Sequence, residues 1–165
     1  MSYTEGLLKK RLYYTHVVQS PDYSFMDSSS LPRHQLIESL IAQHAEDVVD
    51  SAVRLWEEMA VEIVSIISEG GFNSLYARSV FLSQPSIPLL SASALPLQAI
   101  PRFAELKKSF EGLSSSEVSA ANNLLLRVFT DILATLIGED LTSNILRSAW
   151  GNHASEKTGK ESDNE

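Results

Sequence analysis

The chain has 165 residues, a formal net charge of −8 and no cysteine. A chain of this length can bury one hydrophobic core without disulfides, and the lack of cysteine excludes thiol catalysis and cysteine-ligated zinc or iron–sulfur sites. The acidic balance argues against a nucleic-acid partner. We read no apolar run as approaching the length of about 18 residues that a membrane span needs. Residues 1–8 carry acidic Glu5 and no apolar stretch typical of a signal peptide. These features predict a cytoplasmic protein that does not cross a membrane.

Composition divides the chain into three zones. Residues 1–30 show little aliphatic periodicity and form a predicted N-terminal arm that is partly ordered. Residues 31–150 hold nearly all the aliphatic side chains and form the predicted helical bundle domain. Residues 151–165 have no large apolar side chain to offset the entropy of ordering, so we predict a disordered tail.

The strongest helical pattern covers residues 34–68, where apolar residues recur every three or four positions. Pro32 suits the first turn of this helix, and Gly70 with Gly71 suits its C-terminal cap. An unbroken helix here would measure about 52 Å, whereas a compact domain of this size has a diameter of about 27 Å. We therefore expect either a kink near residues 45–47 or a first half that projects toward another chain.

A second predicted helix covers residues 73–82, and Pro85 and Pro88 end it. The following residues, 85–100, are rich in proline and serine but still apolar, so we expect a loop laid over the core. A third helix covers residues 101–112. The predicted core side chains of these two helices are Leu75, Tyr76, Val80, Phe81, Phe103, Leu106 and Phe110.

The fourth predicted helix has the clearest start signal. Ser114 and Glu117 have the spacing of a capping box, and Gly138 ends the helix. A short final helix over 141–150 has Asp140 or Thr142 as its expected N-cap. No segment alternates convincingly as a strand would. The predicted fold is an all-α bundle of four or five helices with one long helix and a disordered C-terminal tail.

Motifs for catalysis and metal binding are missing from the sequence. It contains no paired Glu-x-x-His motif of di-iron bundles, no G-x-S-x-G nucleophile motif and no glycine-rich phosphate loop. His34, Glu38 and His44 could supply two nitrogens and a carboxylate, but we interpret His34 and Glu38 as a surface pair. The sequence therefore predicts a non-enzymatic protein without a metal or cofactor.

The N-terminal arm carries the predicted partner-binding residues. Three cations, Lys9, Lys10 and Arg11, lie beside Tyr13 and Tyr14. Such a segment could dock on the acidic surface of an unidentified protein partner or of a second copy. The alternative is an N-terminal helix packed on its own domain.

The length of the first predicted helix and its wide apolar stripe favour a homodimer. The predicted dimer interface consists of Ile41, His44, Val48, Trp56 and Met59.

Two residues of the second helix form a further candidate site. We expect Arg78 to form an internal ion pair with Glu58 or Asp131, with binding of an anionic ligand by Tyr76 and Arg78 as the other interpretation. In a ligand-binding protein, His44 or Tyr76 would face the cavity.

Residues 55–82 and 129–150 resemble segments of small uncharacterised bacterial helical proteins linked to two-component signalling. The resemblance covers less than a third of the chain and includes no catalytic motif. It implies a bacterial cytoplasmic protein with a regulatory role. The predicted function is a regulatory or adaptor module acting through protein contacts. The alternative is a sensor that binds a small apolar ligand or haem within the bundle.

Overall fold

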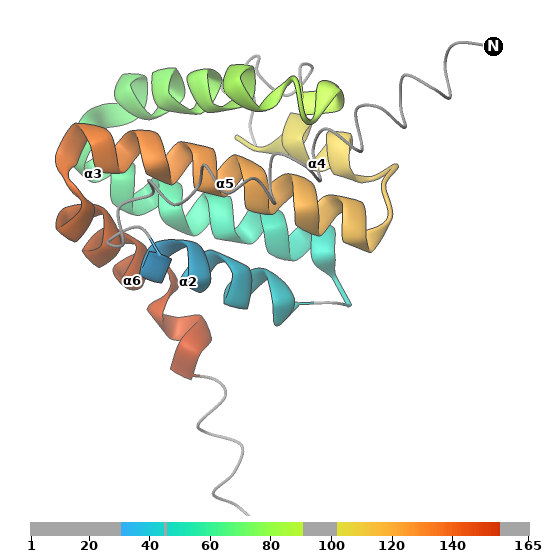
Figure 1. Cartoon of the computed structure of the whole chain (residues 1–165), viewed down its shortest axis with the longest axis horizontal. Helices are drawn as coiled ribbons and strands as arrows, with labels where there is room; N and C mark the ends of the chain where they lie inside the picture. Colours follow the sequence, from blue (N-terminus) through green and yellow to red (C-terminus); the bar gives the residue numbers. More distant parts are fainter. Residues whose placement is uncertain (1–30, 45, 91–101, 156–165) are drawn as a thin grey trace, which may run out of the picture.

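The computed structural model describes residues 31–44, 46–90 and 102–155 as a bundle of α-helices (Figure 1). The described residues contain no strand, so the predicted all-α class is confirmed. Residues 1–30, 45, 91–101 and 156–165 lie outside the described ranges, and they include the predicted arm and most of the predicted tail. The helices are α2 (Leu31–Ala42), α3 (Val48–Ser83), α4 (Ala104–Phe110), α5 (Ser115–Ile137) and α6 (Glu139–Ser155).

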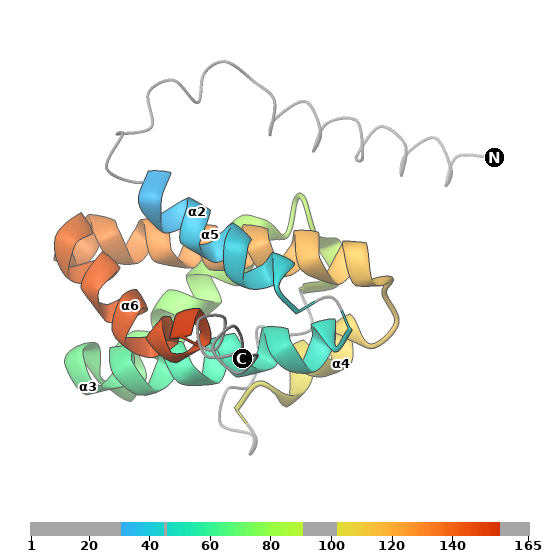
Figure 2. The ribbon, with the colours of Figure 1, turned by 90° about the horizontal axis from the view of Figure 1, so that it is seen from below.

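Helix α5 lies at the centre of the bundle and packs against α2, α3 and α6 (Figures 1 and 2). The capping box predicted at its start is present: Ser114 Oγ accepts from the Glu117 amide, and the Glu117 carboxylate accepts from the Ser114 amide. The helix ends at Gly138 as predicted. Its buried side chains are Val118, Ala121, Asn122, Leu125, Leu126, Phe129, Thr130 and Leu133.

Helix α5 is also long and apolar enough to cross a membrane, with a mean hydropathy of 1.3 over its best window. This corrects our expectation that no segment reaches that threshold. Length and composition alone are weak evidence, because the core helix of a bundle meets the same criterion. Burial of one face against three neighbouring helices accounts for the apolar composition of α5.

The predicted long helix over 34–68 is divided between two elements. The chain leaves α2 after Ala42 and begins α3 at Val48, so the alternative with a break near residues 45–47 is correct. The first half therefore does not project as a continuation of the second. Instead, α2 folds back and contacts α3 and α5 (Figure 2).

Helix α3 contains a sharp reversal at Ser68, whose backbone has φ 71° and ψ 166°. The half over 69–83 runs in the opposite direction to the half over 48–67 (Figures 1 and 2). Ser68 Oγ accepts from the Gly71 amide at 3.3 Å, as an N-cap does. Gly70 and Gly71 therefore open the second half, contrary to our prediction that they cap the first.

The final helix is longer than predicted. It begins at Glu139, directly after Gly138, and continues to Ser155, beyond the predicted boundary at residue 150. Thr142 does not cap it, because its Oγ1 donates to the Gly138 carbonyl from within the helix. The other predicted cap, Asp140, lies in its first turn.

An aromatic cluster forms the centre of the core. The Trp56 ring lies 5.3 Å from the rings of both Tyr76 and Phe129, measured between centroids, and 5.9 Å from Phe103. Its Nε1 donates to the Asn122 side chain, so the buried indole is satisfied. Six of the seven predicted core residues from 73–112 are buried, and the exception is Phe81, which is 68% exposed.

Replacing Ser68 with glycine should stabilise the protein. The backbone at Ser68 lies in a region that only glycine adopts readily, at a cost of about 1–3 kcal/mol, whereas a glycine N-cap costs only a few tenths of a kcal/mol relative to serine. We expect Ser68→Gly to raise the melting temperature by about 2–4 °C, measured by circular dichroism. Ser65→Gly, at an exposed helical site, should lower it. A lower melting temperature for both variants would contradict the assigned strain.

Candidate functional site: a polar clamp beside an apolar groove

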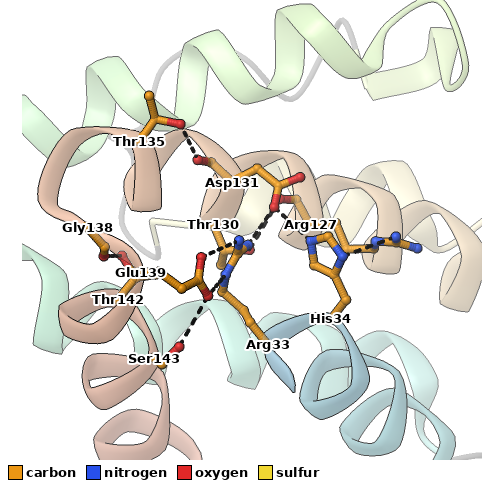
Figure 3. Close-up of polar contacts among 10 residues, drawn as sticks. All are labelled: Arg33, His34, Arg127, Thr130, Asp131, Thr135, Gly138, Glu139, Thr142 and Ser143. Atoms are coloured by element: carbon orange, nitrogen blue, oxygen red, sulfur yellow. Dashed lines mark hydrogen bonds and ion pairs between the residues drawn. The ribbon is translucent and has the colours of Figure 1, made fainter. Parts of the chain in front are cut away.

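A buried arginine in the first turn of α2 joins three helices (Figure 3). The guanidinium of Arg33 binds both oxygens of Glu139, with Nε–Oε1 and Nη2–Oε2 distances of 3.0 Å. Its Nη1 donates to the Thr130 hydroxyl at 2.8 Å and to Asp131 Oδ1 at 2.6 Å. Helix α2 is thereby tied to both α5 and α6.

The Arg33 guanidinium is held in its charged form by these partners. Burial would lower its pKa, but hydrogen bonds to the Glu139 and Asp131 carboxylates raise it above the ordinary value instead. Glu139 also lies in the first turn of α6, where a negative charge is favourable. Arg33 is only 3% exposed, and the two carboxylates offset the free-energy cost of removing its charge from water.

The neighbouring residue, His34, is equally buried, and both of its ring nitrogens are occupied. Nε2 lies 2.7 Å from Asp131 Oδ1, and Nδ1 lies 3.3 Å from Arg127 Nη2. A guanidinium can only donate, so Nδ1 must accept, and Nε2 then carries the proton toward Asp131. His34 therefore has no nitrogen available to act as a general base or a metal ligand.

Asp131 receives hydrogen bonds from both basic residues of α2. Burial alone would raise the pKa of its carboxyl, but hydrogen bonds from His34 and Arg33, together with their charges, lower it below the ordinary value. We name Arg33, His34, Arg127, Thr130, Asp131 and Glu139 the polar clamp.

An open groove of about 370 Å³ lies between the C-terminal part of α2, the start of α3 and the first turns of α5. Nη1 of Arg127, a member of the polar clamp, lies 3.6 Å from Oε1 of Glu38, and Glu38 lines the groove. The apolar lining comes from Ile41, Ala42, Val48 and Ala120, and the polar lining from Glu38, Ser115, Ser116, Ser119 and Asn123.

The predicted dimer-interface residues lie in two different environments. Ile41 and Val48 line the groove, and His44 lies beside it in a narrow cavity. Trp56 and Met59 are both 0% exposed, inside the core of their own chain. Their prediction as interface residues is therefore wrong, because the apolar stripe of this helix is covered by α5 and α6.

His44 has a structural contact on each side. Its Nδ1 donates to the carbonyl of Leu40 at 3.0 Å, near the end of α2, and its ring lies edge-on to His153, with 5.5 Å between centroids. His153 in turn binds the Glu58 carboxylate at 2.7 Å. Within the described residues, no three acidic or histidine side chains are arranged to hold a metal ion.

The ion pair predicted for Arg78 does not form with the expected carboxylates. Arg78 is exposed, whereas Glu58 pairs with His153 and Asp131 pairs with the polar clamp. Tyr76, its predicted companion, is fully buried in the aromatic cluster. These two residues therefore do not share a site. Lys9, Lys10, Arg11, Tyr13 and Tyr14 lie outside the described residues.

Sequence analysis missed Arg33, Thr130 and Glu139 as members of one site. About a hundred positions separate Arg33 from its partners, and no local spacing links them. The one available signal was the placement of Arg33 directly before the apolar pattern of the first predicted helix.

Comparison with family models, with curated proteins and with solved structures finds no match to this chain.

Removing the Arg33 guanidinium should destabilise the protein by about 3 kcal/mol, because among the described residues Glu139 then has no cation beside it and Asp131 keeps only His34 as a basic partner. Equilibrium urea unfolding of Arg33→Ala measures this loss. The matched control is Arg147→Ala, at an exposed site, with an expected effect within about 0.5 kcal/mol. In a double variant with Glu139→Ala, the combined loss should be smaller than the sum of the single losses. Additive effects would show that the two residues are not coupled.

The lowered pKa of Asp131 makes stability depend on pH. In acid the unfolded chain binds this proton more readily than the folded protein, so the contribution is fully present above about pH 4 and is lost as pH falls through the lowered folded pKa. We expect Asp131→Asn to flatten the fall of the unfolding free energy as pH drops below about 4, measured by urea unfolding at a series of pH values. Asp140→Asn, an exposed carboxylate in α6, is the control. An unchanged slope in Asp131→Asn would contradict the assignment.

Proposed function

We propose that the chain is a non-enzymatic regulatory or adaptor module that binds a partner protein in the groove between α2, α3 and α5. The observation that carries this proposal is the groove itself, which combines an open shape with an apolar lining from Ile41, Ala42, Val48 and Ala120. Its volume of about 370 Å³ accommodates a few large side chains of a partner. Buried apolar anchors of this kind carry most of the binding energy in protein interfaces.

The polar clamp supports a binding role for this end of the molecule. Its charges are neutralised by one another, and His34 has no free ring nitrogen for proton transfer. The side chains that look most like catalytic residues therefore have a positioning role. They hold α2 in place, and α2 supplies one wall of the groove.

The charges around the groove indicate the chemistry of the partner. Glu38 lines the groove, and Glu46 and Asp47 are exposed in the connection that leads to Val48. A partner segment that places apolar side chains in the groove and cations on its rim would complement these residues. Such a rim speeds encounter and selects among partners more than it adds affinity.

The alternative is a sensor for a small apolar ligand or haem. The groove volume falls within the range of small-molecule sites, and His44 lies beside it. Because Nδ1 of His44 is bonded to Leu40, only Nε2 remains to ligate haem iron. Absorbance of the purified protein distinguishes the two functions, since haem binding requires a Soret band that His44→Ala removes.

Filling the groove should weaken partner binding without unfolding the protein. Ala120 is exposed and lines the groove, so Ala120→Trp places an indole where the partner would bind. We expect proteins captured from the native lysate by the wild-type chain to bind Ala120→Trp at least about tenfold more weakly, a loss of about 1.4 kcal/mol, when measured with the purified partner by calorimetry.

The matched control is Ser74→Trp, an exposed site on the second half of α3 outside the groove, which should bind normally. Circular dichroism of both variants verifies the fold. Equal binding by Ala120→Trp and wild type, or capture of no protein by the wild type, would contradict the proposal.

A further inference from the structure

We infer that the groove between α2, α3 and α5 is the docking site of the chain's own N-terminal segment, residues 7–18. This inference rests on the proposed function, because the same groove would bind the partner. The docked segment would then act as an intramolecular competitor that the partner must displace.

The lining of the groove matches the side chains of this segment. Residues 7–18 read LLKKRLYYTHVV, and in the docked state their leucine, tyrosine and valine side chains would meet the apolar lining of the groove. On a helix, Leu7, Tyr14 and Val18 would share one face with Arg11 among them, and Leu8 and Leu12 would lie about 100° and 140° around the helix from Leu7. A segment with this pattern can place several apolar groups in one groove.

One polar group in the groove also calls for a partner. Asn123 lines the groove, and within the described residues its buried Oδ1 has no hydrogen-bond partner. The terminal torsion of asparagine is broad, so a rotation of the amide can turn this oxygen toward a bound segment. A tyrosine hydroxyl of the segment could donate to it, which would remove the cost of the unsatisfied acceptor.

Charge favours the same docking. The segment carries Lys9, Lys10 and Arg11 in succession. The groove and its edge carry Glu38, Glu46 and Asp47, and the latter two are exposed. Docking of the segment would therefore bring its cations next to these carboxylates.

The connection to the described helices is long enough for docking on the same molecule. Residues 19–30 link the segment to Leu31 and can span about 40 Å when extended. Helix α2 has 12 residues and is about 18 Å long, and the groove lies at its C-terminal end. A short tether gives an effective concentration in the millimolar range, so binding to the same molecule prevails over binding to a second copy at micromolar concentration.

The absence of cysteine allows a direct test in the full-length chain. A variant with Leu12→Cys and Ser116→Cys has one thiol in the segment and one in the groove lining. With oxidised glutathione as the added oxidant, we expect a disulfide within single chains. Peptide mapping by mass spectrometry and a monomeric mass identify it. Its rate of formation should not change when the protein concentration is raised tenfold.

Two controls separate docking from random collision. Charge reversal at Lys9, Lys10 and Arg11 to glutamate keeps the tether and both thiols, and should slow the disulfide at least about tenfold because like charges then face each other. Moving the second thiol from Ser116 to Ser74, outside the groove, should slow it at least as much.

Each remaining outcome overturns the inference. A disulfide-linked dimer whose formation depends on concentration would assign the groove to the segment of a second copy. Equal rates at Ser116 and Ser74, or no effect of charge reversal, would show that the segment does not dock in the groove.

The crosslink needs no partner protein, so it fails or succeeds independently of the proposed function. A failed crosslink with a partner that is lost in Ala120→Trp would leave the groove as a partner site without an internal competitor. If both hold, the charge-reversed chain should bind the purified partner more tightly than the wild type, because its groove is uncovered.

Discussion

The arrangement of the bundle depends on the compensation of one buried charge. Arg33 is almost completely buried, and a guanidinium cannot lose its proton to reduce the cost of burial. The carboxylates that neutralise it must therefore lie at fixed positions, one at the start of α6 and one late in α5. This requirement sets where α2 lies on α5 and how the corner at Gly138 presents Glu139. Apolar packing alone is less directional, because it would tolerate a helix shifted along the same surface.

Much of the fold could be predicted because its signals are local. The capping box at Ser114, the stop at Gly138 and the spacing of buried residues in α5 each depend on positions within a few turns. The break between α2 and α3 was predicted because an unbroken helix would be longer than the diameter of the domain, and no sequence motif marked it. The end of this helix was predicted two residues too late, at Gly70 and Gly71, because glycine is the residue that most often ends a helix. In the structure, Ser68 has the positive φ that glycine usually adopts, and the chain reverses there.

The candidate site could not be predicted in the same way. Its residues come from the start of α2, the second half of α5 and the start of α6, and only tertiary packing brings them together. A related error led to the prediction of Trp56 and Met59 as dimer-interface residues. An apolar stripe on one helix does not reveal whether another helix of the same chain or a second chain covers it, and here α5 and α6 cover it. Ile41 and Val48 were predicted as interface residues from the same apolar stripe, but they line the groove beside the first turns of α5.

The two ends of α2 therefore differ in their contacts with the rest of the bundle. Its first turn is held by paired charges, and its last turns border a groove that the described helices leave open. Arg127 connects the two ends, since it contacts His34 on one side and Glu38 on the other. A cationic segment that binds at the groove would compete with Arg127 for Glu38. Arg127 therefore links a residue that lines the groove, Glu38, to the contacts that hold α2 on the bundle.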